Sequence, residues 1–130
     1  MNRRLAPLFL ALALLSACAE DRAVYSGMQF DVQSAPASPA SFEPDRIELV
    51  AGEAVKVLAR PRSSGEIDYD DTDILVLRSG DPNVLEVYYT EDEREFVLVG
   101  SEAGQTCLEV LINRHREECI PVRVLAPVTE

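Results

Sequence analysis

Apolar and polar residues alternate in short runs over residues 42–126, and turn-forming residues separate the runs. An alternation of period two is typical of strands with one buried face, and a series of such strands predicts an all-β sandwich. No helical period of useful length follows residue 17. The pattern predicts seven strands, at residues 46–50, 54–60, 73–78, 84–89, 95–99 and 107–112, with a last strand that contains Ile120, Val122 and Val124.

The last two predicted strands form a hairpin with Asn113 at its tip. Cys107 and Cys119 are equidistant from Asn113 and lie on the face opposite the apolar residues. A simple hairpin places them opposite each other, with a Cα separation of ~4.5–5.5 Å that a disulfide accepts. The sequence therefore predicts a Cys107–Cys119 disulfide that stabilises the fold by ~2–3 kcal/mol.

Pro121 interrupts the last predicted strand. Proline has no amide hydrogen to donate to a neighbouring strand, so it is confined mostly to edge strands. The final strand of an immunoglobulin-type sandwich also lies at an edge. We therefore expect the last strand to be an edge strand.

The N-terminus has the pattern of an export signal. Arg3 and Arg4 precede a thirteen-residue apolar run, Leu5–Ala17, which suits a signal peptide and is shorter than the ~20 residues of a membrane span. Residues 15–18 read Leu-Ser-Ala-Cys, which resembles the lipobox of bacterial lipoproteins. In that family the signal is cut before the cysteine and the thiol is acylated. The resemblance implies a signal peptide over residues 1–17 and a lipidated Cys18; the alternative is an ordinary secretory signal.

Residues 18–41 are rich in small residues and proline, and we expect a lipidated N-terminus on a flexible tether. Fully extended, the tether would reach roughly 70 Å. The alternative is that the apolar residues around Val24, Tyr25, Met28 and Phe30 add a strand or dock on a surface. Ala19 replaces the aspartate that marks inner-membrane retention in enterobacterial lipoproteins, which favours the outer membrane. Residues 127–130 form a short C-terminal tail.

The net charge limits which binding partners are expected, and the number of cysteines indicates how they are used. Arg3 and Arg4 are removed with the predicted signal. The remaining chain has ten of the 12 basic residues and all 23 acidic ones, so its net charge is −13. Such a surface repels nucleic acid and anionic lipid, so membrane contact is expected through the lipid alone. Lipidation uses one of the three cysteines, and the other two can pair in an oxidising compartment.

Four segments resemble the bacterial immunoglobulin-like domains of group 2. They are Ile47–Val55, Ser79–Val87, Gly104–Val110 and Val122–Val124, which follow the family patterns "I-x-L … G", "S-x-D-P-x-V", "G-x-A-x-I-x-V" and "V-x-V". The resemblance covers about two-thirds of the chain after residue 17 and implies one small sandwich over residues 42–126. The family often has a tryptophan where this chain has Leu77, and this chain has no tryptophan.

The chain is also similar to the N-terminal domain of pilus-assembly secretins. The opening "I-x-L", the Asp81–Val84 turn and the stretch Val99–Leu108 follow that family's pattern. Both resemblances imply a non-catalytic β-sandwich, but they imply different contacts. The first implies an envelope or cell-surface ligand, and the second implies a pilus or secretion channel.

The run from Glu66 to Asp73 holds the candidate metal ligands. Hard cations such as Ca²⁺ bind several carboxylate oxygens, and Asp68, Asp70 and Asp73 are spaced to share one face of a loop. An EF-hand would need glycine at its sixth position and glutamate at its twelfth, which are absent here. The alternative is a solvated loop in an acidic protein that needs no cofactor.

The remaining polar clusters suggest no catalysis. Residues 90–95 form an acidic turn, which we expect to aid solubility and protect an edge, or to dock a basic partner. His115 is the only histidine and can complete neither a metal site nor a triad by itself. We therefore expect a non-enzymatic, lipid-anchored envelope protein that contacts an envelope protein or a glycan through its sandwich. An accessory protein of a pilus or secretion channel and a Ca²⁺-dependent adhesion module are the alternatives.

Overall fold

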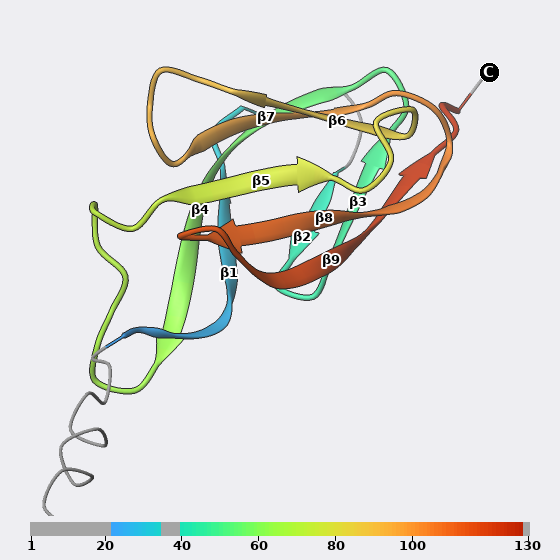
Figure 1. The fold of residues 1–130 in the computed structure, drawn as a ribbon. Helices are drawn as coiled ribbons and strands as arrows, with labels where there is room; N and C mark the ends of the chain where they lie inside the picture. Colours follow the sequence, from blue (N-terminus) through green and yellow to red (C-terminus); the bar gives the residue numbers. More distant parts are fainter. Residues whose placement is uncertain (1–21, 35–39, 129–130) are drawn as a thin grey trace, which may run out of the picture.

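The computed structural model describes residues 22–34 and 40–128, and these residues form two β-sheets packed face to face (Figure 1). The four-stranded sheet has the order β1 (Val24–Val32), β4 (Ala54–Ser64), β7 (Glu95–Gly100), β6 (Leu85–Tyr89). The five-stranded sheet has the order β2 (Ser41–Glu43), β3 (Arg46–Val50), β9 (His115–Leu125), β8 (Gly104–Ile112), β5 (Leu75–Ser79). The prediction of an all-β sandwich is confirmed, with nine strands over the described residues in place of seven.

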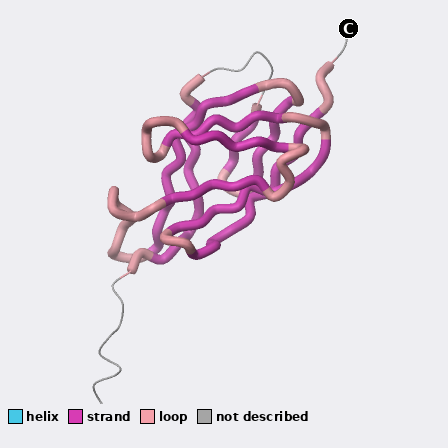
Figure 2. The backbone as a smooth tube through the Cα atoms, turned by 45° about the horizontal axis from the view of Figure 1, so that its top comes forward, coloured by secondary structure: helices cyan, strands magenta, loops and turns pink. Residues whose placement is uncertain are grey.

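Loops and turns gather at the two ends of the sandwich, while the strands run between them (Figure 2). Neighbouring strands are antiparallel except β3 and β9, which are parallel. Among the described residues, no helix is long and apolar enough to cross a membrane. The predicted signal peptide and Cys18 lie outside the described residues.

The core lies between the two sheets and consists of the inward-facing residues of each strand. Alternate positions are buried in β4, β7, β8 and β9, as the period of two predicts. Over the described residues, the buried set contains no polar or charged side chain. The largest fully buried side chains are Phe96, Met28, Ile47, Leu49, Leu77, Leu85, Leu98, Leu108 and Ile120.

Residues 24–32, which the composition assigns to the tether, form strand β1 against β4. A bulge between Tyr25 and Gly27 reverses the alternation, so that Tyr25, Met28 and Phe30 all contact the core. Because of the bulge, the apolar residues of β1 do not alternate with a strict period of two, and the sequence pattern does not predict the strand. The folded body therefore starts at β1 rather than at residue 42, and the predicted tether can span at most the residues before it.

Strand β9 is an interior strand, between β3 and β8, and the prediction that it lies at an edge is wrong. The carbonyl of Cys107 accepts a hydrogen bond from the amide of Gly80 at 2.9 Å, so the main chain of Cys107 is directed toward β5. Its partner Pro121 therefore occupies a pair without hydrogen bonds between β8 and β9. On the other side, pairing with β3 begins only at Val122, so the proline interrupts neither ladder.

Candidate functional site

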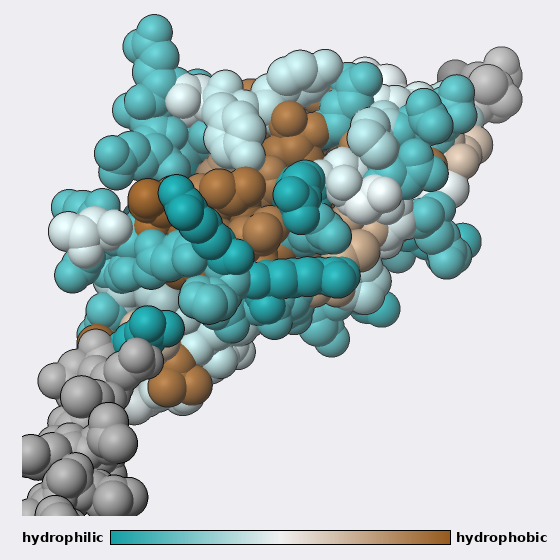
Figure 3. All heavy atoms as spheres, in the orientation of Figure 1, coloured by the Kyte–Doolittle hydropathy of each residue, from teal (hydrophilic) through white to brown (hydrophobic). Residues whose placement is uncertain are grey.

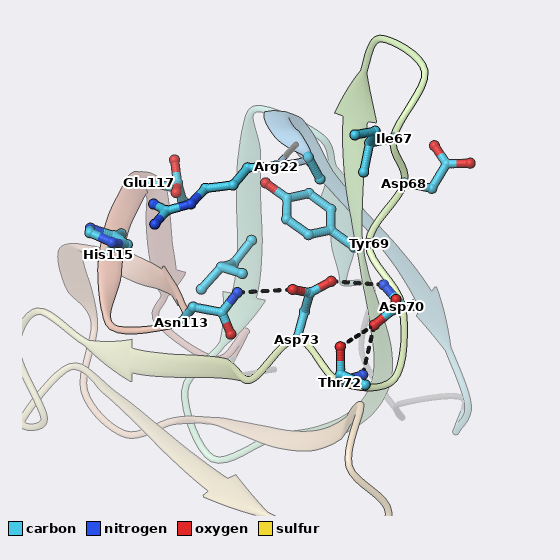
Figure 4. Close-up of a pocket in the computed structure, with 12 residues that line it drawn as sticks. Arg22, Ile67, Asp68, Tyr69, Asp70, Thr72, Asp73, Asn113, His115 and Glu117 are labelled. Carbon is cyan, nitrogen blue, oxygen red and sulfur yellow. Dashed lines mark hydrogen bonds between the residues drawn. The ribbon is translucent and has the colours of Figure 1, made fainter. Parts of the chain in front are cut away.

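One end of the sandwich carries a shallow hollow that contains most of the polar residues singled out from the sequence (Figure 4). Three segments form it: residues 22–23 before β1, residues 67–73 between β4 and β5, and the tip of the β8–β9 hairpin. The start of β1 lies at this end because Val24 pairs with Ser64, the last residue of β4. The hollow thus adjoins the point where the N-terminal segment enters the fold.

The tip of the β8–β9 hairpin is a two-residue turn that lines the hollow through Asn113. Asn113 and Arg114 both have positive φ, at 52° and 74°, as a type I′ hairpin turn requires. The amide oxygen of the Asn113 side chain accepts from the Ile74 amide, and its nitrogen donates to the Asp73 carboxylate, both at 2.9 Å. A single asparagine therefore joins the hairpin to the acidic loop.

Each of the three aspartate carboxylates of the acidic loop accepts hydrogen bonds from nearby donors. The Asp70 carboxylate accepts from the amide and the hydroxyl of Thr72, and the Asp73 carboxylate accepts from the Asp70 amide at 2.8 Å. The Asp68 carboxylate accepts from the Ser63 hydroxyl at 2.9 Å. The bonds from Thr72 are the main cause that lowers the pKa of Asp70 below its usual range.

The structure does not assemble the predicted Ca²⁺ site from Asp68, Asp70 and Asp73. Asp68 points away from the other two carboxylates in Figure 4. The three carboxylates accept from different donors: Asp68 from Ser63 of β4, Asp70 from Thr72, and Asp73 from the Asp70 amide and Asn113. Over the described residues, no group of three or more histidine, cysteine, aspartate or glutamate side chains is arranged to hold a metal ion. The carboxylates of this loop accept hydrogen bonds from nearby amide and hydroxyl donors, and the three do not converge on a common point where an ion could bind.

Tyr69 faces the middle of the hollow, between Arg22 and Asp73 (Figure 4). Burial raises the pKa of its phenol, and the negative charges of Glu117 and Asp73 raise it further. His115 is exposed at the rim of the same hollow. The hollow therefore offers carboxylate, amide and phenol groups, several of which are already engaged in holding its own loops.

Arg94 extends the network to the acidic turn over residues 90–95. Its guanidinium donates to the carbonyls of Asp70 and Asp73, at 2.8 and 2.9 Å. Glu95 forms an ion pair with Lys56 at 3.0 Å. This turn therefore positions the acidic loop, a role that the prediction of a solubility patch did not include.

A polar contact that was not predicted from the sequence lies beside the hollow, between Tyr25 of β1 and Glu118 of β9. The Tyr25 hydroxyl donates to the Glu118 carboxylate at 2.5 Å, and the two strands belong to different sheets. Glu118 pairs with the buried Val110 and is in phase with Ile120, so its side chain points between the sheets. An acidic residue at an inward position was the available signal in the sequence.

Cys107 and Cys119 form the predicted disulfide on the outer face of the hairpin, with a Cα separation of 5.3 Å. They are not directly opposite, because Cys107 pairs with Pro121 and Cys119 pairs with Glu109. A bulge after Val110 shifts the register from the simple hairpin. The disulfide is confirmed, and it joins diagonal rather than opposed residues.

No protein-family model matches the chain, and no curated protein matches it in sequence. Among solved structures, the chain is similar to domains 4 and 5 of the S-layer protein SbsC, with 15% sequence identity and a TM-score of 0.48. That similarity covers 71% of this chain and 54% of the other, so this chain spans about half of that structure.

Proposed function

We propose that this protein is a lipid-anchored, non-catalytic module of the bacterial cell envelope, attached through Cys18 and acting by binding another envelope component. The proposal combines the lipobox-like sequence with the position of β1. Five residues, 19–23, separate Cys18 from Val24, the first residue of the strand. Fully extended, so short a segment reaches about 20 Å, compared with the roughly 70 Å that a tether ending at residue 41 would reach.

This short connection gives the folded body a definite orientation toward the membrane. Strand β1 begins at the end that carries the hollow, while β8 begins and β9 ends at the opposite end (Figure 1). The hollow would therefore face the bilayer, and the turns before β6 and β8 would face away. Carboxylates of Asp68, Asp70, Asp73 and Glu117 line the proximal end and would repel anionic headgroups, which keeps the body off the lipid surface.

An immunoglobulin-like topology is part of the proposal. In a constant-type immunoglobulin sandwich, one sheet has the strand order A-B-E-D and the other contains C, F and G. The order β1-β4-β7-β6 corresponds to A-B-E-D, and the neighbours β9, β8 and β5 correspond to G, F and C. The short strands β2 and β3 are additions beside G. This correspondence supports a binding module, since such sandwiches present loops at both ends and strands at their edges.

Fractionation of a Cys18→Ser variant tests the anchor. We expect the unsubstituted protein in the membrane fraction at its processed size. The variant should appear either in the soluble fraction or as the larger precursor that still carries its signal peptide. A Glu102→Cys substitution, at the distal end, serves as a matched control that must remain in the membrane. Membrane retention of the Cys18→Ser variant at the processed size, without the signal peptide, would overturn the proposal.

The orientation has its own test. A fluorophore attached at Glu66→Cys should be quenched strongly by a quencher in the lipid headgroups, and the same fluorophore at Glu102→Cys should be quenched weakly. Equal quenching at both positions would contradict a short connection, even if the protein is lipidated.

A further inference from the structure

A shallow apolar groove lies between β5 and β6, the edge strands that close the two sheets on the same side. Leu77 of β5 and Val87 and Tyr89 of β6 line it. The Tyr89 hydroxyl donates to the Leu77 carbonyl at 3.2 Å and joins the two edges. Figure 3 shows hydrophobic surface at this place, in the middle of the view where Figure 1 draws β5 and β6.

Exposed apolar side chains are concentrated along this groove. Seven large apolar side chains are exposed over the described residues. Tyr88, at 51%, and Tyr89, at 60%, line the groove, and Ile74, at 66%, lines the neighbouring hollow beside β5. Ile74 directly precedes β5, and the two tyrosines end β6. Exposed apolar surface that gathers in one place on a small protein marks an interaction site more often than scattered residues do.

The main chain of β6 is available for pairing along the groove. The Val84 carbonyl accepts from the Ser101 amide, so the alternation of hydrogen bonds directs Glu86 and Tyr88 toward β7. The amides and carbonyls of Val87 and Tyr89 are therefore turned to the open side, where no described strand pairs with β6. A strand with such an edge can accept an extended segment from another protein.

The opposite side of the sandwich is protected against such pairing. The edge strand β1 is bulged between Tyr25 and Gly27, and β2 has only three residues. The rings of Phe30 and Phe42, whose centroids are 5.8 Å apart, cover the gap between these two strands. Bulges and short strands are common means of preventing edge pairing, and neither β5 nor β6 is bulged. On β5, the outward Leu77 carbonyl already accepts from Tyr89, so β6 has the freer edge of the two.

Charges around the groove favour a basic occupant. Beside the start of β5, a neighbouring hollow is lined by three carboxylates, of Asp71, Asp73 and Glu93, and by one cation, Arg94. On β6, Glu86 is the charged residue of the strand, while the cation on β5, Arg78, is paired with Glu109 at 2.7 Å. The carboxylates thus remain as the rim's excess charge, in a protein whose net charge is −11 even with its first residues included.

We propose that the open edge of β6 binds an extended segment of a partner protein as an added strand. The segment carries apolar side chains at alternate positions, which enter the groove, and lysine or arginine at its ends, which face the acidic rim. This inference deepens the proposed function by naming the contact surface and the chemistry of the partner. It does not depend on the lipid anchor.

The probe is the synthetic peptide Lys-Val-Thr-Val-Thr-Val-Lys with blocked ends. It is added to the full protein, isolated from cells in its processed form and kept in detergent. We expect chemical-shift changes at β6 and β5, and amide exchange slowed about tenfold or more at Val87 and Tyr89. A peptide with glutamate at both ends should bind at least about fivefold more weakly.

Two N-methylated versions of the peptide test strand pairing without altering the protein. Methyl groups on the amides of one edge of an added strand remove its hydrogen bonds to β6, and methyl groups on the other edge do not. One version should therefore lose binding and the other should retain it. Equal binding of the two versions would overturn strand addition.

A matched pair of proline variants tests the location. Val87→Pro removes an amide that faces the open side of β6 and should abolish peptide binding. Val32→Pro makes the same change on β1: Gln33 bonds to Lys56 of β4, so the neighbouring Val32 amide faces outward. This control should bind normally, and loss of binding in it alone would overturn the assignment to β6.

Two further outcomes would overturn the proposal. The first is the absence of shifts at β6 at millimolar peptide. The second is protection of the Val87 and Tyr89 amides in the protein alone together with a dimer in sedimentation, because the edge would then be occupied by a second copy. Either failure would leave the membrane anchoring tested by Cys18→Ser unaffected.

Discussion

The hydroxyl of Tyr25 and the carboxylate of Glu118 are 93 positions apart in the chain and 2.5 Å apart in the fold. This hydrogen bond joins β1 of the four-stranded sheet to β9 of the five-stranded sheet at the end where the N-terminal segment enters. The half-buried carboxylate gains a donor, and the first strand of the sandwich is fixed to the last. The contact thus limits how far the proposed anchor segment can extend.

Tyr25→Phe should lower the free energy of unfolding by about 1–2 kcal/mol, because it removes the hydrogen bond to a charged group and keeps the ring. Urea unfolding followed by circular dichroism measures the loss. Tyr88→Phe is the control, since Tyr88 is exposed and its hydroxyl bonds to Glu86 of the same strand, and a change below about 0.5 kcal/mol is expected. Equal effects of the two substitutions would contradict a structural role for the contact.

Stability should fall at alkaline pH. Burial and the contact with Glu118 raise the pKa of Tyr25, so folding favours the protonated phenol. The corresponding stabilisation is complete below the unfolded pKa of about 10 and is lost as the pH rises above it. Urea unfolding between about pH 8 and about pH 11 should show this decline, and Tyr25→Phe should flatten it. An identical slope in the variant would assign the decline to other groups.

Removal of the disulfide should destabilise the protein without changing its fold. The Cys107→Ala and Cys119→Ala double variant should lose about 2–3 kcal/mol, because the bond closes a short loop in the unfolded chain. Reductant should lower the stability of the unsubstituted protein by a similar amount and leave the double variant unchanged. A response of the variant to reductant would contradict the assignment.

The hairpin tip should respond in opposite directions to substitutions at adjacent positions. Asn113→Ala should cost about 1–2 kcal/mol, because it removes both side-chain hydrogen bonds to residues 73 and 74 and places alanine at positive φ. Arg114→Gly should be stabilising by up to about 1 kcal/mol, because glycine accepts the φ of 74° without strain. Thermal unfolding of the two variants measures both effects, and destabilisation by Arg114→Gly would contradict the turn type.

The pKa of Asp70 should depend on the hydroxyl of Thr72. Thr72→Val removes the hydroxyl donor that is the main cause of the lowered pKa of Asp70, so that pKa should rise toward its ordinary value. Carboxyl chemical shifts followed through an acid titration measure it. Thr90→Val, in the neighbouring turn, is the control and should leave the pKa of Asp70 unchanged. If the pKa of Asp70 does not rise in the Thr72→Val variant, the backbone amides alone hold the carboxylate, and the role given to the hydroxyl is wrong.

The sequence allowed prediction of the parts of the fold where alternation is regular. The first predicted strand, at residues 46–50, coincides with β3, and the inward faces of β8 and β9 are as predicted. The prediction failed at β1, where a bulge breaks the period, and at Pro121, whose position in the ladder depends on the register of two other strands. Register and bulges are properties of paired strands, so one strand's sequence does not determine them.

The candidate site was only partly predictable for a similar reason. The acidic loop and the disulfide are local in sequence, and both were identified as features. The contacts of Asn113 with residue 73, and of Arg94 with the same loop, join segments 40 and 21 positions apart and carry no local pattern. The aspartates therefore suggested a metal site, while the structure gives them structural partners.

The mass of the N-terminal peptide of the purified protein tests the central claim most directly. Trypsin should release the peptide Cys18–Arg22 if the signal has been removed at the predicted site. We predict that this peptide begins at Cys18 and carries the added mass of acyl chains on the cysteine. A peptide with an unmodified Cys18, or one that still contains residues before it, would contradict the account of a short lipid anchor.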